Sequence, residues 1–166
     1  ATATRTEPQF GRRLAGYRLN DLASQAQAWF FGGAILSLLG FSMPWFKHSS
    51  RAQWWYSGWQ LWRNEGLDWI VVIYLAYVAL LVAGFLLLGR NPAGAAATLA
   101  LAIAVICGTL LVLAISTGDA LEGIRDMSRL IWNLGLPVMF LGHALLLTGA
   151  LLGLALEITR EIVIGQ

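Results

Sequence analysis

The stretch WIVVIYLAYVALLVAGFLLLGRNPAGAAATLALAIAVICGTLLVLAIS, residues 69–116, decides the fold. Its two apolar parts, residues 69–88 and 93–116, contain no charged side chain. Each is long enough to cross a bilayer, which takes about 20 apolar residues in a helix. The apolar residues are continuous rather than alternating, which favours helices over membrane strands. Between them, Gly89-Arg90-Asn91-Pro92 predicts a tight turn with Pro92 starting the next helix. The stretch therefore predicts an antiparallel hairpin of two transmembrane helices.

Two further segments have the same character. Residues 26–43 form an uncharged run that ends at Pro44, and residues 134–156 form another near the C-terminus. The sequence thus predicts an all-α integral membrane protein with four transmembrane helices in an antiparallel bundle. Residues 1–25 are expected to form a basic tail or interfacial helix, and residues 26–166 the transmembrane domain.

The composition supports a membrane protein. The chain has 166 residues, 58% of them apolar and 12% charged, and its formal net charge is +2. Soluble domains carry about 25% charged residues, and a globule of this size cannot bury so much apolar surface. The small net charge, with no basic stripe beyond the N-terminal tail, argues against a nucleic-acid partner. The single cysteine, Cys107, excludes an intramolecular disulfide and is interpreted as a small buried apolar residue.

The basic residues predict the orientation. The first ten residues, ATATRTEPQF, lack the apolar core of a signal peptide, so we expect a cytoplasmic tail whose initiator Met has been removed. Four arginines precede the first span, and the first helix usually dominates topology: Arg5, Arg12, Arg13 and Arg18. Both termini are therefore expected in the cytoplasm, at a bacterial inner membrane. The tail is expected to lie on anionic lipid or to contact a neighbouring subunit.

Tryptophan is concentrated in the loop between the first two spans, residues 44–69. Six of the eight tryptophans lie there: Trp45, Trp54, Trp55, Trp59, Trp62 and Trp69. Soluble proteins rarely expose so much aromatic surface. A bilayer interface suits Trp, because the indole has an apolar body and an N–H that bonds water or headgroups. The sequence therefore predicts a Trp-rich interfacial loop.

Part of this loop has a helical period. Trp55, Trp59 and Trp62 stand at i, i+4 and i+7, which predicts one face of a short helix. Ser57 is expected to cap a helix that restarts at Gly58. Three interpretations of the face are open: an anchor in the interface, a docking face for a partner subunit, or an aromatic box for a flat ligand such as a quinone, carotenoid or other pigment.

The phrase LSLLGFSMPWF…SGWQLW, within residues 35–62, resembles small, mostly uncharacterised four-helix bacterial membrane proteins. Those proteins have a Gly-rich first helix that ends in Pro-Trp, followed by a loop with Ser-Gly-Trp. The resemblance implies four spans and a short outer loop, and it implies no activity.

A line of small residues runs along one side of the fourth span: Gly135, Gly142, Gly149 and Gly153. Small residues let helix backbones approach closely in lipid. Packing within the bundle is one interpretation, and the simplest neighbour is then the third span with its own small series, Ala100, Ala104 and Gly108. The alternative is a contact surface for another subunit's helix or for a polyene tail.

His143 is the one strongly polar side chain expected near the middle of the bilayer, where ionisable residues are candidates for function. Three roles are open: ligand to a metal in a pigment or haem, proton relay, or hydrogen bond across the bundle. The only other histidine, His48, lies in the outer loop, which argues against a bis-His haem site within this chain. For the structural role, Thr109 or Ser37 would be the partner.

The link between the third and fourth spans, residues 117–129, carries charges at i+3 and i+4 spacing: Asp119, Glu122, Arg125, Asp126 and Arg129. This spacing predicts a solvated helical extension of the fourth span. The C-terminal EITREIVIGQ is expected to continue the same helix out of the membrane.

The motifs that the sequence lacks restrict its function. It has no phosphate-binding G-x-x-x-x-G-K-[ST], no H-E-x-x-H and no C-x-x-C, so neither an enzyme nor a metal site is expected. The spans lack the buried charges that pumps usually need. The first hypothesis is an accessory subunit of a respiratory or photosynthetic membrane complex, with other membrane subunits and lipid as partners. Such a chain would bind no cofactor alone but would share lipid, quinone or pigment at its surface. The second is a free-standing oligomeric binder or transporter that uses His143 and the Trp loop.

Overall fold

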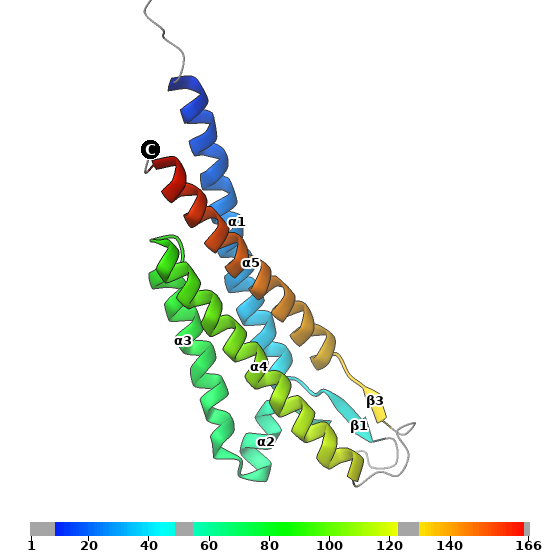
Figure 1. Ribbon diagram of the computed structural model, residues 1–166. Helices are drawn as coiled ribbons and strands as arrows, with labels where there is room; N and C mark the ends of the chain where they lie inside the picture. The colour runs from blue at the N-terminus through cyan, green and yellow to red at the C-terminus, as the bar shows by residue number, and fades with distance from the viewer. Residues whose placement is uncertain (1–8, 49–54, 123–129, 165–166) are drawn as a thin grey trace, which may run out of the picture.

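The computed structural model describes residues 9–48, 55–122 and 130–164 (Figure 1). Four long helices dominate it: α1 (Gln9–Ser42), α3 (Val71–Leu87), α4 (Pro92–Glu122) and α5 (Gly135–Ile164). The shorter elements are β1 (Phe46–His48), β2 (Trp55–Tyr56), α2 (Gly58–Glu65), the 3₁₀ turn η1 (Asp68–Ile70) and β3 (Leu130–Trp132). The described chain is thus predominantly helical, as the sequence predicts.

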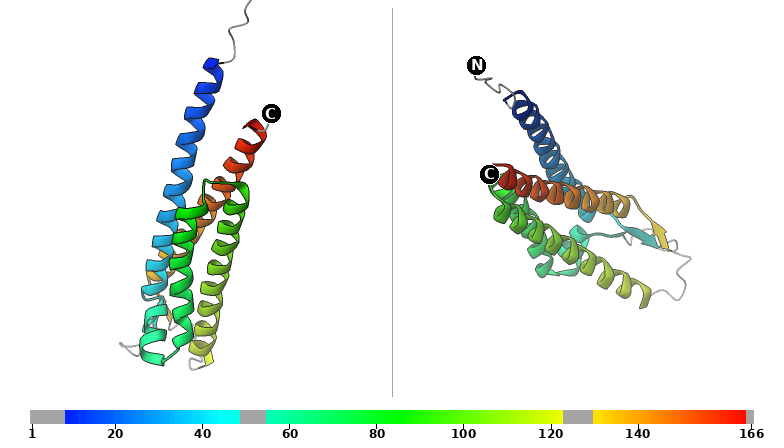
Figure 2. Two further views of the ribbon diagram at one scale, coloured as in Figure 1. Left: turned by 90° about the vertical axis from the view of Figure 1, so that its left-hand side faces the viewer. Right: turned by 45° about the horizontal axis from the view of Figure 1, so that its top comes forward.

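Four helical segments are long and apolar enough to cross a membrane: one lies in each of α1, α4 and α5, and one consists of η1 and α3 together. The segments are Leu19–Ser42, Asp68–Leu87, Pro92–Ser116 and Gly135–Val163. All four predicted spans are therefore confirmed as apolar helices, with boundaries that differ from the predicted ones by at most seven residues. The beginning of α1 and the end of α5 lie at the same end of the molecule, beside the α3–α4 turn (Figures 1 and 2).

The outer helices are longer than a span. α1 continues without interruption across residue 25, where the sequence predicts the end of a separate tail. Its first turns project beyond the α3–α4 turn (Figure 2). α5 runs to Ile164, which confirms the expected continuation of the last helix. Residues 1–8 lie outside the described part of the chain.

The turn between α3 and α4 has the predicted form. Gly89 has a positive φ of 87°, which favours glycine because other residues meet a steric penalty there. Asn91 Oδ1 accepts a hydrogen bond from Gly94 N at 2.6 Å and so satisfies a free N–H of the first turn of α4. Pro92, which has no N–H to satisfy, is the first residue of that helix.

Three of the four glycines of α5 face α1 or the residues just after it rather than α4, which corrects the predicted pairing. A methyl group at Gly142 would collide with the backbone of Ser37, one at Gly149 with that of Phe30, and one at Gly135 with that of Pro44. Gly153 instead approaches the side chain of Leu88. The seam does pack within the chain, but the neighbour is the first span.

Two glycines of α1, Gly33 and Gly40, approach the backbone of α5 at Leu146 and Met139 in return. Because glycine stands on both helices, the two backbones come into direct contact, which no larger residue permits. The third-span series does not take part: Ala100 and Ala104 are exposed, and Gly108 lies against Ile73 of α3. All four glycines of the seam are buried by this chain, which contradicts their assignment as a contact surface for another subunit.

The core has two parts. One lies among the four helices and includes Phe30, Tyr77, Leu80, Val105 and Leu146. The other lies where the helices meet the loop elements and is rich in aromatic residues: Phe41, Trp45, Phe46, Leu61, Ile70, Val112, Leu136 and Met139. The second part fixes the loop elements against the ends of the helices.

A small sheet, which is not predicted from the sequence, joins the two loops. β1 pairs antiparallel with β2 on one side and with β3 on the other. Trp45 N donates to Tyr56 O at 2.6 Å, and Asn133 N donates to Trp45 O at 2.8 Å. Because α1 ends at Ser42, just before Pro44, the following backbone groups need new partners, and these strands supply them. Strands of two or three residues are too short to show alternation in the sequence.

The second loop therefore differs from its prediction. Residues 117–122 continue α4, the third span, and Leu130–Trp132 form a strand, so the expected helical extension of the fourth span is wrong there. Of the charged residues, Asp119 and Glu122 lie in α4. Arg125, Asp126 and Arg129 lie outside the described residues.

Candidate functional site

The candidate site is a buried polar cluster to which each of the four long helices contributes one side chain. These are Ser37 of α1, Tyr77 of α3, Thr109 of α4 and His143 of α5; three of them are fully buried, and His143 is 6% exposed. Because these side chains are buried inside the bundle, the four polar groups bond to one another instead of to water. Buried polar groups require such partners.

Hydrogen bonds connect the cluster from α1 to α5. Tyr77 Oη donates to Ser37 Oγ at 3.1 Å and lies 3.4 Å from His143 Nε2. Thr109 Oγ1 lies 3.1 Å from the same nitrogen and donates its hydrogen to Ile106 O at 2.8 Å. His143 Nε2 of α5 therefore contacts side chains of both α3 and α4, and Tyr77 connects these contacts to Ser37 of α1.

This arrangement confirms the expected bond between His143 and Thr109. Ser37, the other predicted partner, joins the cluster through Tyr77 rather than directly. Tyr77 itself is not among the site residues that the sequence predicts. The sequence does contain an indication of its role, because Tyr74 and Tyr77 are the only hydroxyl-bearing residues in the predicted span of residues 69–88. A second tyrosine bond, from Tyr74 Oη to Ser42 Oγ at 3.2 Å, lies nearer the loops.

The other histidine belongs to a different part of the molecule. His48 is the last residue of β1 and pairs with Leu130 of β3. Among the described residues, no three His, Cys, Asp or Glu side chains are placed to hold a metal ion together. Cys107 is exposed on α4, so its interpretation as a buried residue is wrong.

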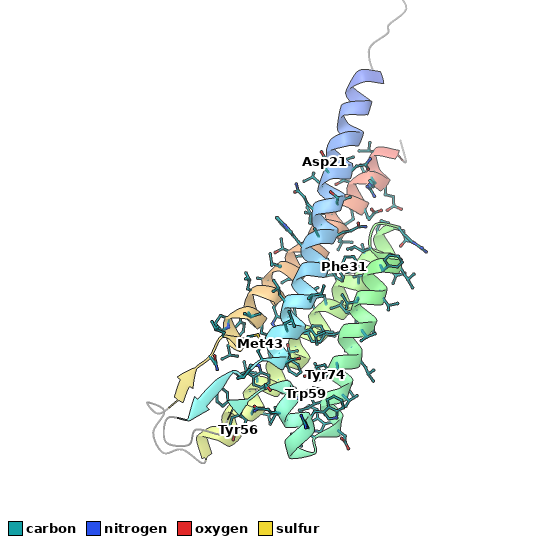
Figure 3. The ribbon with its side chains drawn as sticks, turned by 180° about the vertical axis from the view of Figure 1, so that it is seen from behind. Asp21, Phe31, Met43, Tyr56, Trp59 and Tyr74 are labelled. Atoms are coloured by element: carbon teal, nitrogen blue, oxygen red, sulfur yellow. The ribbon has the colours of Figure 1, made fainter. Side chains whose placement is uncertain are left out.

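The tryptophans of the loop divide into buried and exposed residues. Trp45 is fully buried and donates from Nε1 to Gly40 O at 3.1 Å, which contradicts its assignment to a partner or lipid surface. Trp62 is partly buried between the rings of Trp59 and Tyr74, at centroid distances of 5.2 Å and 5.9 Å. Trp59 is 45% exposed, at the same end of the molecule as Tyr74 (Figure 3).

The predicted helical face of this loop is only partly right. Ser57 Oγ accepts from Gln60 N at 3.1 Å and caps α2, as expected. Trp55, however, lies in β2, before the cap, and so does not share a helical face with Trp59 and Trp62. Trp54 lies outside the described residues, and its assignment to a contact surface stays a prediction.

An exposed apolar surface continues from the loop along α3. Trp69 of η1 is 45% exposed, and the outward residues that follow it at helical spacing are exposed by 51–78%: Val72, Leu75, Val78, Val82 and Phe85. We call this set, with Trp69, the outer stripe of α3.

At the opposite end of the molecule, Glu157 is buried and pairs with Arg160 at 2.6 Å. This pair lies beside a shallow hollow between Gln27 and Leu88.

Comparison with protein-family models, with curated proteins and with solved structures finds no match for this chain. The resemblance of residues 35–62 to small four-helix bacterial membrane proteins therefore stays a prediction.

Proposed function

We propose that this chain is a non-catalytic accessory subunit of a larger bacterial membrane complex, and specifically of a respiratory or photosynthetic electron-transfer assembly. In this proposal the four helices cross the inner membrane as an antiparallel bundle, with both termini in the cytoplasm. The partners are other membrane subunits and lipid.

One observation carries the proposal: the outer stripe of α3, which begins at Trp69, and the exposed Trp59 of α2 together form an aromatic and aliphatic surface. Trp is enriched where proteins meet each other and where they meet the bilayer interface. Large apolar side chains exposed by more than half need either lipid or a partner to cover them.

The contacts inside the bundle also support a role in which this chain packs against larger subunits. The buried polar side chains of Ser37, Tyr77 and Thr109 bond within the bundle, and the α5 glycines bring its helices into contact. These features build a rigid unit with an apolar exterior. Such a unit is suited to filling space and holding lipid or a shared cofactor between larger subunits.

The test is gentle detergent extraction of the tagged chain from its native membrane, followed by blue-native electrophoresis, mass spectrometry and an absorption spectrum of the same band. We expect co-migration with haem- or pigment-bearing subunits. A colourless, homogeneous oligomer of this chain alone would overturn the proposal and favour a free-standing binder or transporter.

A matched set of variants asks whether the exposed tryptophans contact protein. We expect the double variant Trp59→Ala/Trp69→Ala to lose at least tenfold of the co-migrating subunits while the chain stays folded. Trp29→Ala is the control, because Trp29 is similarly exposed, by 42%, but lies on α1. Equal recovery of partners from all three proteins would show that Trp59 and Trp69 contact lipid only.

A further inference from the structure

His143 has one ring nitrogen that the bundle leaves without a partner. Nε2 contacts Thr109 and Tyr77, whereas Nδ1 is buried and forms no hydrogen bond among the described residues. The side chain as a whole is more than nine-tenths buried. An unsatisfied buried nitrogen at membrane depth is costly, and its presence calls for a functional explanation.

The hydrogens of the neighbouring hydroxyl groups determine which tautomer is present. Tyr77 donates its hydrogen to Ser37, and Thr109 donates its hydrogen to Ile106 O. Neither hydroxyl then has a hydrogen left for His143, so Nε2 must carry the ring hydrogen and donate it to Thr109 Oγ1. In a neutral imidazole the other nitrogen is then an acceptor. Nδ1 therefore holds a free lone pair.

Phe140 is an aromatic side chain that packs against the His143 ring and also reaches the outer surface. The two nitrogens point to different sides of the ring: Nε2 faces Tyr77 of α3 and Thr109 of α4, and Nδ1 lies on the side away from these bonds. Phe140, one helical turn before His143, packs edge to face against the imidazole at a centroid distance of 6.4 Å and an interplanar angle of 85°. The Phe140 side chain is 48% exposed, so its ring lies partly on the outer surface.

We propose that His143 Nδ1 is a binding site for a lipid-soluble molecule that carries an aromatic hydroxyl, such as a quinol, and that this hydroxyl reaches Nδ1 when the Phe140 ring rotates outward. The free lone pair selects a hydrogen-bond donor. The exposed phenyl ring provides an apolar surface for a flat head group, while the tail stays in lipid. This site does not depend on the proposed accessory role, because it belongs to a single chain.

The test uses the purified full-length chain in phosphatidylcholine nanodiscs, with decylubiquinol and decylubiquinone as probes. The two have nearly the same shape, but only the quinol has hydroxyl groups to donate. We expect the quinol to bind at least tenfold more tightly, which is the factor given by about 1.4 kcal/mol for one hydrogen bond. Equal affinities, or tighter binding of the quinone, would overturn the proposal.

Two substitutions separate the ligand site from the structural bond. In His143→Asn the amide takes the place of Nδ1, and in His143→Gln it takes the place of Nε2. We expect the Asn variant to retain quinol binding within about threefold and to lose stability. The Gln variant should retain stability and lose quinol binding tenfold or more. The reverse pattern would show that only the Nε2 bond matters.

A measurement on the unsubstituted chain keeps the proposal testable if a variant does not fold. With ¹⁵N-labelled histidine, added quinol should shift the Nδ1 resonance of His143 and leave that of Nε2 nearly unchanged. Phe140→Ala should speed this response, because it removes the ring that covers the imidazole. An Nδ1 resonance that stays unchanged at saturating quinol would refute the site.

Discussion

Replacement of Gly142 by alanine is expected to separate α1 from α5. A methyl group at this position would lie 2.6 Å from Ser37 Cα and 2.8 Å from the carbonyl carbon of Leu36, and it would also collide with Ser37 N. Carbon atoms in ordinary contact are about 3.5–4.0 Å apart. All these atoms belong to the backbone and cannot rotate away, so the helices must move apart by roughly 1 Å.

The expected loss of stability follows from two opposing effects. Overpacking of a tight contact costs up to about 3 kcal/mol, and alanine recovers about 1 kcal/mol through its better helix propensity. The free energy of unfolding should therefore fall by about 2 kcal/mol, which corresponds to a decrease in Tm of roughly 4–8 °C for a chain of this size. The 3.1 Å bond between Tyr77 and Ser37 should also weaken, because Ser37 is part of the contact.

Gly32→Ala provides the matched control. Gly32 lies in α1, the helix that Gly142 of α5 contacts, but a methyl group at Gly32 would meet nothing within 4 Å. This variant should keep or raise Tm, because it gains helix propensity without a collision. Thermal unfolding in a mild detergent, followed by circular dichroism and Trp fluorescence, compares the two proteins. If both substitutions change Tm by the same amount, close packing of α1 on α5 is refuted.

Substitutions at three further positions test the loop and the cluster. Trp45→Phe keeps an aromatic ring at this buried position but removes the donor to Gly40 O and leaves a small cavity, and should lower the free energy of unfolding by at least about 1 kcal/mol in a denaturant titration. Ser57→Ala removes the bond to Gln60 N and should cost about 1 kcal/mol, with faster amide exchange in α2, whereas Ser57→Asp should restore protection. Tyr77→Phe should cost about 1–2 kcal/mol through lost bonds across the bundle; unchanged stability would contradict the role of this hydroxyl.

The spans were predictable because their signal is local. Each is an uninterrupted apolar run, and its ends are marked by residues with their own backbone preference, such as Pro44 and the Gly89 to Pro92 turn. The Ser57 cap was predictable for the same reason, since a cap depends on a few consecutive residues. The β1–β3 pairing was not, because residues about 85 positions apart in the sequence must meet to form it.

The partner of a helix face is harder to predict than the face itself. The glycine line of α5 correctly indicates a close neighbour, but glycines occur in α1 and small residues occur in α4 as well, so spacing alone cannot decide between them. Two helices pack closely only where small residues on one helix lie opposite the backbone of the other along the whole contact. Gly33 and Gly40 of α1 lie against the α5 backbone at Leu146 and Met139. Ala100 and Ala104 of α4, in contrast, are exposed.

The polar cluster shows why one residue of a site can be predicted while its neighbours are missed. His143 stands out in an apolar helix, and a polar group buried there must find a partner. A tyrosine in an apolar helix is ambiguous, because its ring suits lipid, core and interface equally well. Only the three-dimensional arrangement shows that the Tyr77 hydroxyl is committed to Ser37. That commitment, with the Thr109 bond to Ile106 O, leaves the lone pair of His143 on Nδ1. The chemistry available at His143 is thus determined by two hydroxyl groups on other helices.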